Sequence, residues 1–357
     1  YREALNIQVS TSDEAGVGTV QNILGNNRIG AIIPDDWECV GSIADEKNDV
    51  LYSFVTNDTD SAIVEYTKLR GEELVLVDIG NNILNFSQGD IITGINVIDG
   101  FLLWTDGNTE PKKIDIERSK QGTTNITTNT KLYVDNAIVL DNAGNQIDIT
   151  EEHITVIRKK PLRQLSVKIN PAAIDNKKPL FEKIFPRFSY RYRYDDGEYS
   201  SYAPFTDVVF NSEYPIDDDT GTSYDENTAY DTREPYNSGM RNMIDSIELS
   251  DFISPIIPKD VVQVDILYKQ ENSSVIYLVE VIKNTDPAWV ASGFNPSSSY
   301  KGNFTVSSEN IYAALPENQL LRSWDNVPRK ALAQEITGNR LVYGNYTQSY
   351  NLETSPT

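Results

Sequence analysis

The stretch Ile91–Arg118, IITGINVIDGFLLWTDGNTEPKKIDIER, predicts a complete small antiparallel β-unit. Its first strand ends at Asp99-Gly100, a dipeptide that favours the tight turn of a β-hairpin. The apolar run Phe101–Trp104 that follows is typical of a buried strand. After a second turn at Asp106–Asn108, residues 113–116 alternate polar and apolar side chains, as a half-exposed strand does. Taken alone, this pattern fits either an ordinary β-meander or one blade of a β-propeller.

Two further windows repeat this order of strand, turn, apolar strand and aromatic residue. They are Val40–Tyr66, before the central stretch, and Ile336–Asn345, near the end of the sequence. Tyr52 and Trp104 take equivalent places about 52 positions apart, slightly more than the roughly 40 to 50 residues of one four-stranded propeller blade. Tyr343 takes the same place in the last window. The repeat therefore predicts a propeller-like domain that is interrupted after its second unit and resumed later.

The interrupting segment is predicted to form a separate β-sandwich. In Phe185–Tyr194, FPRFSYRYRY, an aromatic ring stands at every second position from Phe188, so these rings share one face of a strand. Arg191 and Arg193 then lie on the opposite face. Tyrosine interleaved with arginine can also bind nucleic acid by stacking. Burial of the rings in a core, with the arginines outside, is the favoured interpretation.

We therefore expect an all-β fold in which a β-propeller-like domain is interrupted by an inserted Ig- or fibronectin-like β-sandwich. The first part of the propeller-like domain is expected at residues 1–157, the sandwich at 158–305 and the return at 306–357. Further strands are expected at 74–79 and 83–86 as a hairpin, and at 132–140, 147–157, 166–169, 199–205, 208–210, 244–249, 261–268, 275–282 and 303–306. A loop is expected at 214–237, a linker at 292–302 and a short helical turn at 316–321.

The composition excludes several classes of protein. The chain of 357 residues has one histidine and one cysteine, which exclude a disulfide framework and a His/Cys metal cluster within it. The cysteine, Cys39, is predicted to be a small core residue rather than a nucleophile. No run of about 18 apolar residues occurs, so no membrane-spanning helix is expected.

The charge is strongly acidic, with a formal net value of −22. Binding to phosphate backbones relies on clustered lysine and arginine, so this balance argues against it. Two interpretations stay open: an acidic wall along which DNA slides without adhering, or acidity that only keeps the protein soluble. The dense basic cluster, Arg158, Lys159, Lys160 and Arg163, is typical of a solvated linker or a protein contact.

Motifs for catalysis are absent from the sequence, which contains no nucleophile elbow, phosphate-binding loop or zinc-protease motif. Acidic pairs occur in expected turns at Asp35-Asp36, Glu151-Glu152 and Asp195-Asp196. A glycosidase needs two carboxylates facing one cleft about 5 to 10 Å apart, and the sequence leaves that arrangement open. Asp217–Asp219 lacks the ligand spacing of an EF-hand, which favours a solvated loop. We assign no catalytic, cofactor-binding or metal-binding residue.

Five segments together resemble large tail structural proteins of short-tailed bacteriophages, in particular the nozzle or muzzle proteins of crAss-like and related phages. In chain order they are YREALNIQVSTSDEAGVGTVQNILGN, ITGINVIDGFLLWTDGNTEPKKIDI, FPRFSYRYRYDDGEYSSYAPF, VDILYKQENSSVIYLVEVI and SWDNVPRKALAQEITGNRLVYGNY. The resemblance spans nearly the whole chain in order, and no single motif is diagnostic. Members of this family usually begin upstream of Tyr1 and run past residue 357, so we expect a processed or partial chain.

This resemblance implies a non-enzymatic virion component of the distal tail, without a cofactor. Several copies would form a homo-oligomeric ring around the channel through which genomic DNA leaves without specific binding. The ring would also dock neighbouring tail ring, adaptor and fibre proteins. The acidic excess is then expected on the channel wall, and Lys159, Lys160 and Arg163 away from it or in subunit contacts.

The sequence leaves a rival of another class open. It is a glycan-binding or glycan-cleaving receptor-recognition β-protein of a phage or bacterial surface, and a bacterial adhesin is a third possibility. A glycan site needs aromatic side chains exposed in a groove beside carboxylates, whereas the tail-protein interpretation needs them buried.

Overall fold

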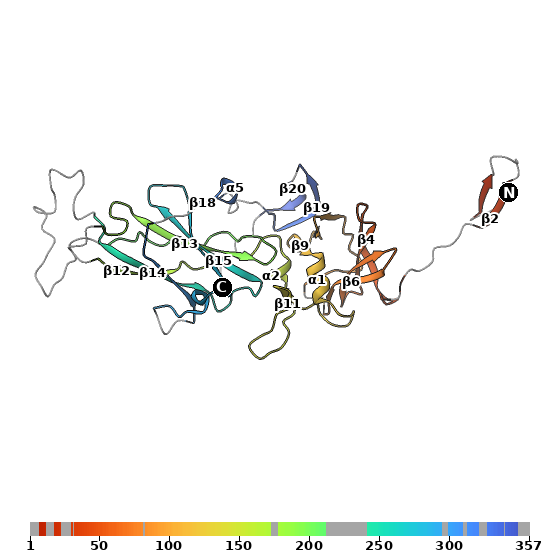
Figure 1. The fold of residues 1–357 in the computed structure, drawn as a ribbon. Coiled ribbons are helices and arrows are strands. Elements are labelled where there is room, and N and C mark those ends of the chain that lie inside the picture. Colours follow the sequence, from red (N-terminus) through yellow and green to blue (C-terminus); the bar gives the residue numbers. More distant parts are fainter. Residues whose placement is uncertain are drawn as a thin grey trace, which may run out of the picture.

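The computed structural model describes residues 7–11, 18–22, 30, 32–80, 83–172, 178–211, 241–294, 299–309, 313–320, 327–338 and 340–348. Within them most of the regular structure is β, and the sheets are open and antiparallel (Figure 1). The all-β part of the prediction is confirmed. The predicted loop at 214–237, with Asp217–Asp219, lies outside the described residues, and the predicted linker at 292–302 lies partly outside them.

The first region, residues 32–157, contains two larger sheets whose strands pair with their neighbours in the chain, besides one two-stranded pairing at residues 133–138. The four-stranded sheet consists of β3 (Glu38–Asp45), β4 (Val50–Thr56), β5 (Ser61–Thr67) and β6 (Gly71–Asp78). The three-stranded sheet consists of β7 (Gly94–Ile98), β8 (Phe101–Thr105) and β9 (Lys112–Asp115). The turn between β7 and β8 lies at Asp99-Gly100, as predicted. Both residues have positive φ, +48° and +83°, which Asp tolerates and Gly adopts freely.

The two sheets of the first region bury one shared apolar core. Phe54 of β4 stacks on Phe86 with ring centroids 5.4 Å apart, and Trp104 of β8 meets Phe54 edge-on at the same distance. Tyr52 and Ile95 belong to the same core. Because rings from both sheets meet here, these contacts fix how the two units stack.

Two helices lie in the described part of the first region, and only the second falls where a strand was predicted. Helix α1 (Ile116–Gly122) follows β9 directly, and the Asp115 side chain caps it by accepting a hydrogen bond from the Arg118 amide. The predicted strand at 147–157 is wrong, because helix α2 (Glu151–Ile154) begins there after Thr150. The predicted strand at 132–140 is reduced to a two-residue pairing of β10 (Tyr133–Val134) with β11 (Ala137–Ile138).

Two other local predictions are wrong. Residues 83–86 form a connection rather than a strand, because the Ile83 and Leu84 amides donate to Asp78 Oδ2 and cannot join a ladder. Cys39 is exposed rather than buried. It lies at a register shift between β3 and β4, which turns its side chain away from the core.

The second region, residues 166–320, contains two sheets whose strands are not in chain order. One sheet has the order β12 (Ser166–Pro171), β14 (Ile244–Ile253), β17 (Lys301–Val306). The other has the order β13 (Pro186–Tyr194), β15 (Val261–Gln270), β16 (Tyr277–Lys283), β18 (Ala313–Ala314). Two short helices, α4 (Pro287–Val290) and α5 (Glu317–Leu320), complete it. Because β18 pairs with β16, the second region continues past residue 305.

The core of the second region confirms the aromatic face predicted for β13, but Arg191, which was expected outside, is buried and pairs with Asp265 at 2.9 Å. Phe188, Tyr190, Tyr192 and Tyr194 are all buried, together with apolar residues of β14 and β15 from both sheets. Residues 199–210 run beside β13 without forming a regular strand. Every third amide donates to β13: those of Ser200, Ala203, Thr206 and Val209, to the carbonyls of Tyr192, Tyr190, Phe188 and Pro186.

The hairpin of β19 (Lys330–Thr337) and β20 (Arg340–Thr347) returns to the first region. It lies against β7, where a Cβ on Gly94 would come within 3.0 Å of the Gln334 amide nitrogen. Tyr52, Trp104 and Tyr343 each lie on the second strand of an antiparallel unit, on β4, β8 and β20. A further hairpin pairs β1 (Ile7–Thr11) with β2 (Gly18–Asn22).

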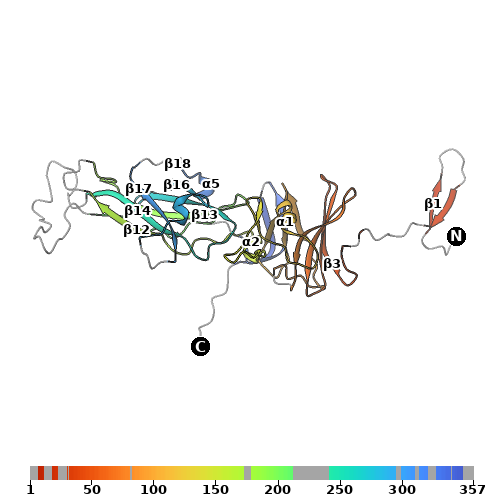
Figure 2. The same ribbon diagram turned by 60° about the horizontal axis from the view of Figure 1, so that its bottom comes forward.

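Figures 1 and 2 show the two regions lying end to end, with α2 at their junction and β19–β20 beside the first region. The chain crosses this junction between α2 and β12, and crosses back after α5. The two crossings bring residues far apart in the sequence into contact at the junction.

Candidate functional site at the junction of the two regions

A buried ionic cluster joins the two regions. Its centre is Arg158, on the segment after α2, whose side chain is 1% exposed. Its Nη2 donates to Asp196 Oδ2 at 2.5 Å, and its Nη1 donates to the His153 carbonyl at 2.6 Å. Its guanidinium also lies 5.0 Å from the ring centroid of Tyr194, whose hydroxyl donates to the Lys159 carbonyl. One side chain therefore binds both α2 and the tip of β13.

The turn after β13 supplies the main carboxylate of the cluster. Gly197, with φ +81°, lets the turn carry Asp195 and Asp196 towards the first region. Asp196 accepts the hydrogen bond from Arg158, and Lys113 Nζ of β9 lies 3.3 Å from the same carboxylate oxygen, Oδ2. Burial by itself raises the pKa of the Asp196 carboxyl, but the charges of Arg158 and Lys113 outweigh burial and hold its pKa at about 2. Asp196 is therefore ionised and ties together three segments.

His153 and Asp260 complete the cluster, and both are buried. The Thr150 amide donates to His153 Nδ1 at 3.0 Å, so the neutral imidazole carries its proton on Nε2. That atom lies 3.9 Å from Asp260 Oδ1, and Arg158 Nη1 lies 3.5 Å from Asp260 Oδ2. Burial lowers the pKa of His153 to about 4 and raises the pKa of Asp260 to about 6. Arg158 and Arg118 offset only part of the rise at Asp260.

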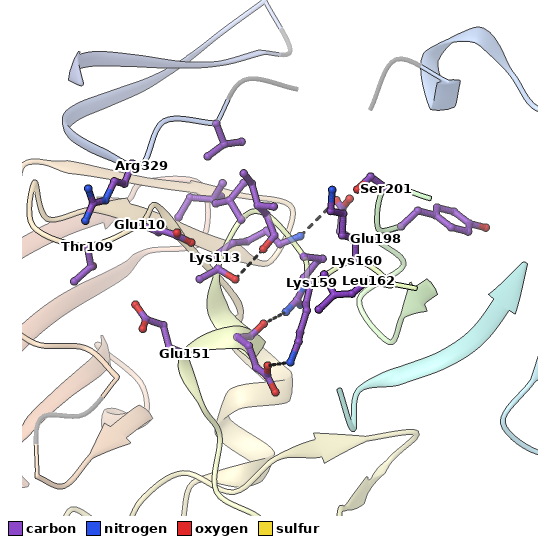
Figure 3. Close-up of a pocket in the computed structure, with 18 of the residues that line it drawn as sticks. Thr109, Glu110, Lys113, Glu151, Lys159, Lys160, Leu162, Glu198, Ser201 and Arg329 are labelled. Atoms are coloured by element: carbon purple, nitrogen blue, oxygen red, sulfur yellow. Dashed lines mark hydrogen bonds and ion pairs between the residues drawn. The ribbon is translucent and has the colours of Figure 1, made fainter. Parts of the chain in front are cut away.

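A cleft of about 970 Å³ opens beside this cluster. Figure 3 shows Glu110, Glu151 and Arg329 on one side of it, and Lys160, Leu162 and Glu198 on the other. Most of its charges are paired: Lys112 with Glu151 at 2.6 Å, Lys159 with Glu152 at 3.1 Å, and Lys113 with Glu198 at 3.4 Å. Burial, followed by the charge of Glu151, raises the pKa of the Glu110 carboxyl. Glu110 is thus the cleft residue whose environment best suits a proton donor.

The sequence-predicted residues divide between this junction and other places. The acidic pairs Glu151-Glu152 and Asp195-Asp196 come together here, whereas Asp35-Asp36 does not take part. Arg158 is buried, so its assignment to a solvated linker is wrong. Lys160 and Arg163 are exposed, as that prediction requires.

Asp260 and Lys113 were not identified from the sequence. Neither stands in a motif, and each gains its role only when chain segments far apart in the sequence meet.

The described ranges contain no group of three or more His, Cys, Asp or Glu side chains placed to hold a metal ion. No helix in the described part of the chain is long and apolar enough to cross a membrane. No known protein family matches the chain, and no curated protein matches it.

Proposed function

We propose that this chain is a structural subunit of a bacteriophage tail, of the nozzle or muzzle type. Several copies form a ring at the distal end of the tail, around the channel through which the genome leaves. The ring also serves as the platform on which neighbouring ring, adaptor and fibre proteins dock. In this proposal the first region and hairpin β19–β20 are units of a propeller-like domain, and the second region is an Ig- or fibronectin-like insert.

The buried cluster around Arg158 is the observation that carries the proposal. A buried charge that loses its partner is costly, so the cluster resists separation of the two regions. The single carboxylate of Asp196 binds both Lys113, from β9 of the first region, and Arg158, from the segment after α2. A subunit that holds two β-regions end to end as one body suits a structural role in an assembly. The resemblance of the sequence to tail proteins supports a bacteriophage tail as that assembly.

The charge supports the passage of DNA. A net charge of −22 per copy repels the phosphate backbone, and repeated around a ring it forms a wall to which DNA does not adhere. The isolated chain should therefore show no measurable affinity for double-stranded DNA even at low salt, where counterion release makes phosphate contacts strongest. Tight, salt-sensitive binding would contradict this role.

Two kinds of electron microscopy test the proposal. The purified chain should form rings in negative stain and in cryo-EM, and antibodies to it carrying gold should label the tail tip of virions. In the reconstructed ring, Asp and Glu should be enriched on the wall of the channel. A protein that stays monomeric and is absent from virions would overturn the proposal. A neutral or basic channel would overturn only the role of the charge.

One observation favours a second candidate function, cleavage of a glycan in the cleft at the junction. Glu110 and Glu151 both line this cleft, and the pKa of Glu110 is raised, as for the acid of a glycosidase. Hydrolysis of host surface polysaccharide that Glu110→Gln abolishes, with Glu117→Gln as an exposed control, would establish it. Absence of hydrolysis by the native chain leaves the structural role as the function.

A further inference from the structure

We propose that neighbouring copies of this chain bind through two different surfaces, a basic apolar patch on one copy and an acidic groove on the next. This inference rests on the proposed ring and names the surfaces that build it. The patch is defined by Lys160, Leu162, Arg163 and Ile256. The groove lies between the turns of β3–β4, β5–β6 and β7–β8.

The patch combines cations with exposed apolar side chains. Among the described residues that line its shallow hollow, every charged side chain is basic, although the chain carries a net charge of −22. Leu162 and Ile256 are 68% and 67% exposed. The Arg163 guanidinium lies 5.0 Å from the ring centroid of Tyr300, which holds it at the surface. Lys160 is exposed and has no ionic partner in the described part of the chain.

The groove has the opposite charge and its own apolar surface. Its volume is about 1470 Å³, and six acidic residues line it against three basic ones. Glu46, Asp49 and Asp99 stand on its hairpin turns and form no ion pair with any described residue. Leu69, on the β5–β6 turn, is 97% exposed, and Leu51 is also exposed. The groove therefore offers a wide acidic rim beside apolar side chains, with room for an inserted loop.

The two surfaces are opposite in charge, and each also exposes apolar side chains. Burying Leu162 and Ile256 against Leu69 and Leu51 removes apolar area from water, and the opposite charges fix the register of the contact. No residue lines both surfaces, so one copy can use both at once. A contact between two different surfaces is heterologous, and it builds a ring where its rotation closes. Two cations beside exposed apolar residues are a poor site for DNA by comparison.

Two variants separate the surfaces. The patch variant is Lys160→Glu with Arg163→Glu, and the groove variant is Glu46→Lys with Asp99→Asn. Asparagine is chosen because residue 99 has φ +48°, a conformation that Asn tolerates. Either variant alone should raise the concentration needed for assembly at least about tenfold, measured by mass photometry and sedimentation. A control variant, Lys168→Glu with Lys283→Glu, carries the same change in net charge as the patch variant and should assemble like the native chain.

Mixing the two variants gives the sharpest result. The groove variant keeps a native patch and the patch variant keeps a native groove, so one contact can form and no further copy can add to it. At a concentration where each variant alone is monomeric, an equimolar mixture should therefore yield 1:1 dimers and no rings. Unchanged rings in both variants would overturn the assignment of the surfaces, as would a mixture that contains only monomers.

The outcomes also distinguish this inference from the proposed function. Gold labelling of tail tips together with unchanged assembly of both variants would leave the ring function and remove these surfaces. A native chain that remains monomeric and is absent from virions would remove both. DNA binding that the patch variant abolishes, with assembly unchanged, would identify the patch as a nucleic-acid site and overturn the inference.

Discussion

The two regions build antiparallel sheets in opposite ways. In the first region β3, β4, β5 and β6 pair in chain order, as do β7, β8 and β9, so each pairing closes a short loop. In the second region β12 pairs with β14 and β13 with β15, so the chain crosses between sheets at almost every step. Non-local pairings form only after a larger loss of chain entropy. The stability of the second region is therefore expected to depend on its shared core and on its attachment to the first region, rather than on local turns.

The largest effect is expected from removing Arg158. Arg158→Met leaves Asp196 with Lys113 alone and leaves Asp260 buried without its nearest cation, which should cost on the order of 4 kcal/mol in free energy of unfolding. Because the cluster joins the regions, thermal unfolding followed by calorimetry should change from one transition to two. Hydrogen exchange should then show which of the two regions opens at the lower temperature.

A matched variant tests whether charge is the cause. Arg158→Met combined with Asp196→Asn and Asp260→Asn removes the cation and both carboxylates, so no uncompensated buried charge remains. We expect this triple variant to lose clearly less stability than the single one. Equal losses would mean that packing of the Arg158 side chain, rather than its charge, holds the junction.

Removal of one ring from each core compares the regions directly. Trp104 and Tyr192 are both buried. Trp104 lies in the core shared by the two larger sheets of the first region, and Tyr192 lies in the core shared by the two sheets of the second region. Trp104→Ala and Tyr192→Ala should each cost on the order of 3 kcal/mol or more, measured by urea unfolding. Tyr346→Ala, at a tyrosine 55% exposed on β20, should change stability by less than about 0.5 kcal/mol. A loss at Tyr192 no larger than at Tyr346 would show that β13 does not bury its aromatic face.

How much of this the sequence predicts depends on distance along the chain. The turn at Asp99-Gly100 and the alternating rings of β13 carry their own local signal, and both were predicted. Helix α1 also had a signal, since Asp115 before Ile116 and Glu117 is a helix start, but the alternation of residues 113–116 concealed it. The contact of Arg158 with Asp260 has no local signal at all. The junction could therefore not be predicted from the sequence, although its acidic pairs could be noted.

The pH dependence of stability separates two groups that oppose each other in the cluster. Burial lowers the pKa of His153 from 6.5 to about 4. Its contribution to the free energy of unfolding is therefore fully present above pH 6.5 and is lost as the pH falls towards 4. Burial raises the pKa of Asp260 from 3.8 to about 6, so stability falls as the pH rises from about 4 to 6. Each pKa shift corresponds to roughly 3 kcal/mol in the free energy of unfolding. The native chain should therefore change little in stability across this range.

Single variants should reveal the two opposing slopes. Asp260→Asn leaves the histidine, so its free energy of unfolding should rise with pH between about 4 and 6.5. His153→Asn keeps an acceptor for the Thr150 amide and leaves the aspartate, so its free energy of unfolding should fall over the same range. Urea unfolding at intervals of pH measures both. Profiles with the same slope in the two variants would show that the groups do not titrate as their burial implies.

The smallest effect is expected at an exposed ion pair of the second region, which repeats the chemistry of Arg158 without its burial. Lys168 Nζ on β12 lies 3.3 Å from Glu248 Oε1 on β14, and the Lys168 side chain is 50% exposed. Water already solvates both charges, so Lys168→Ala should change the free energy of unfolding by less than about 0.5 kcal/mol. Glu248 keeps a hydrogen bond from Asn170, so the carboxylate is not left without a partner. A loss close to that of Arg158→Met would mean that cross-strand pairing, rather than burial, sets the strength of ionic contacts in this protein. The contrast between the junction and the sheet surfaces would then disappear.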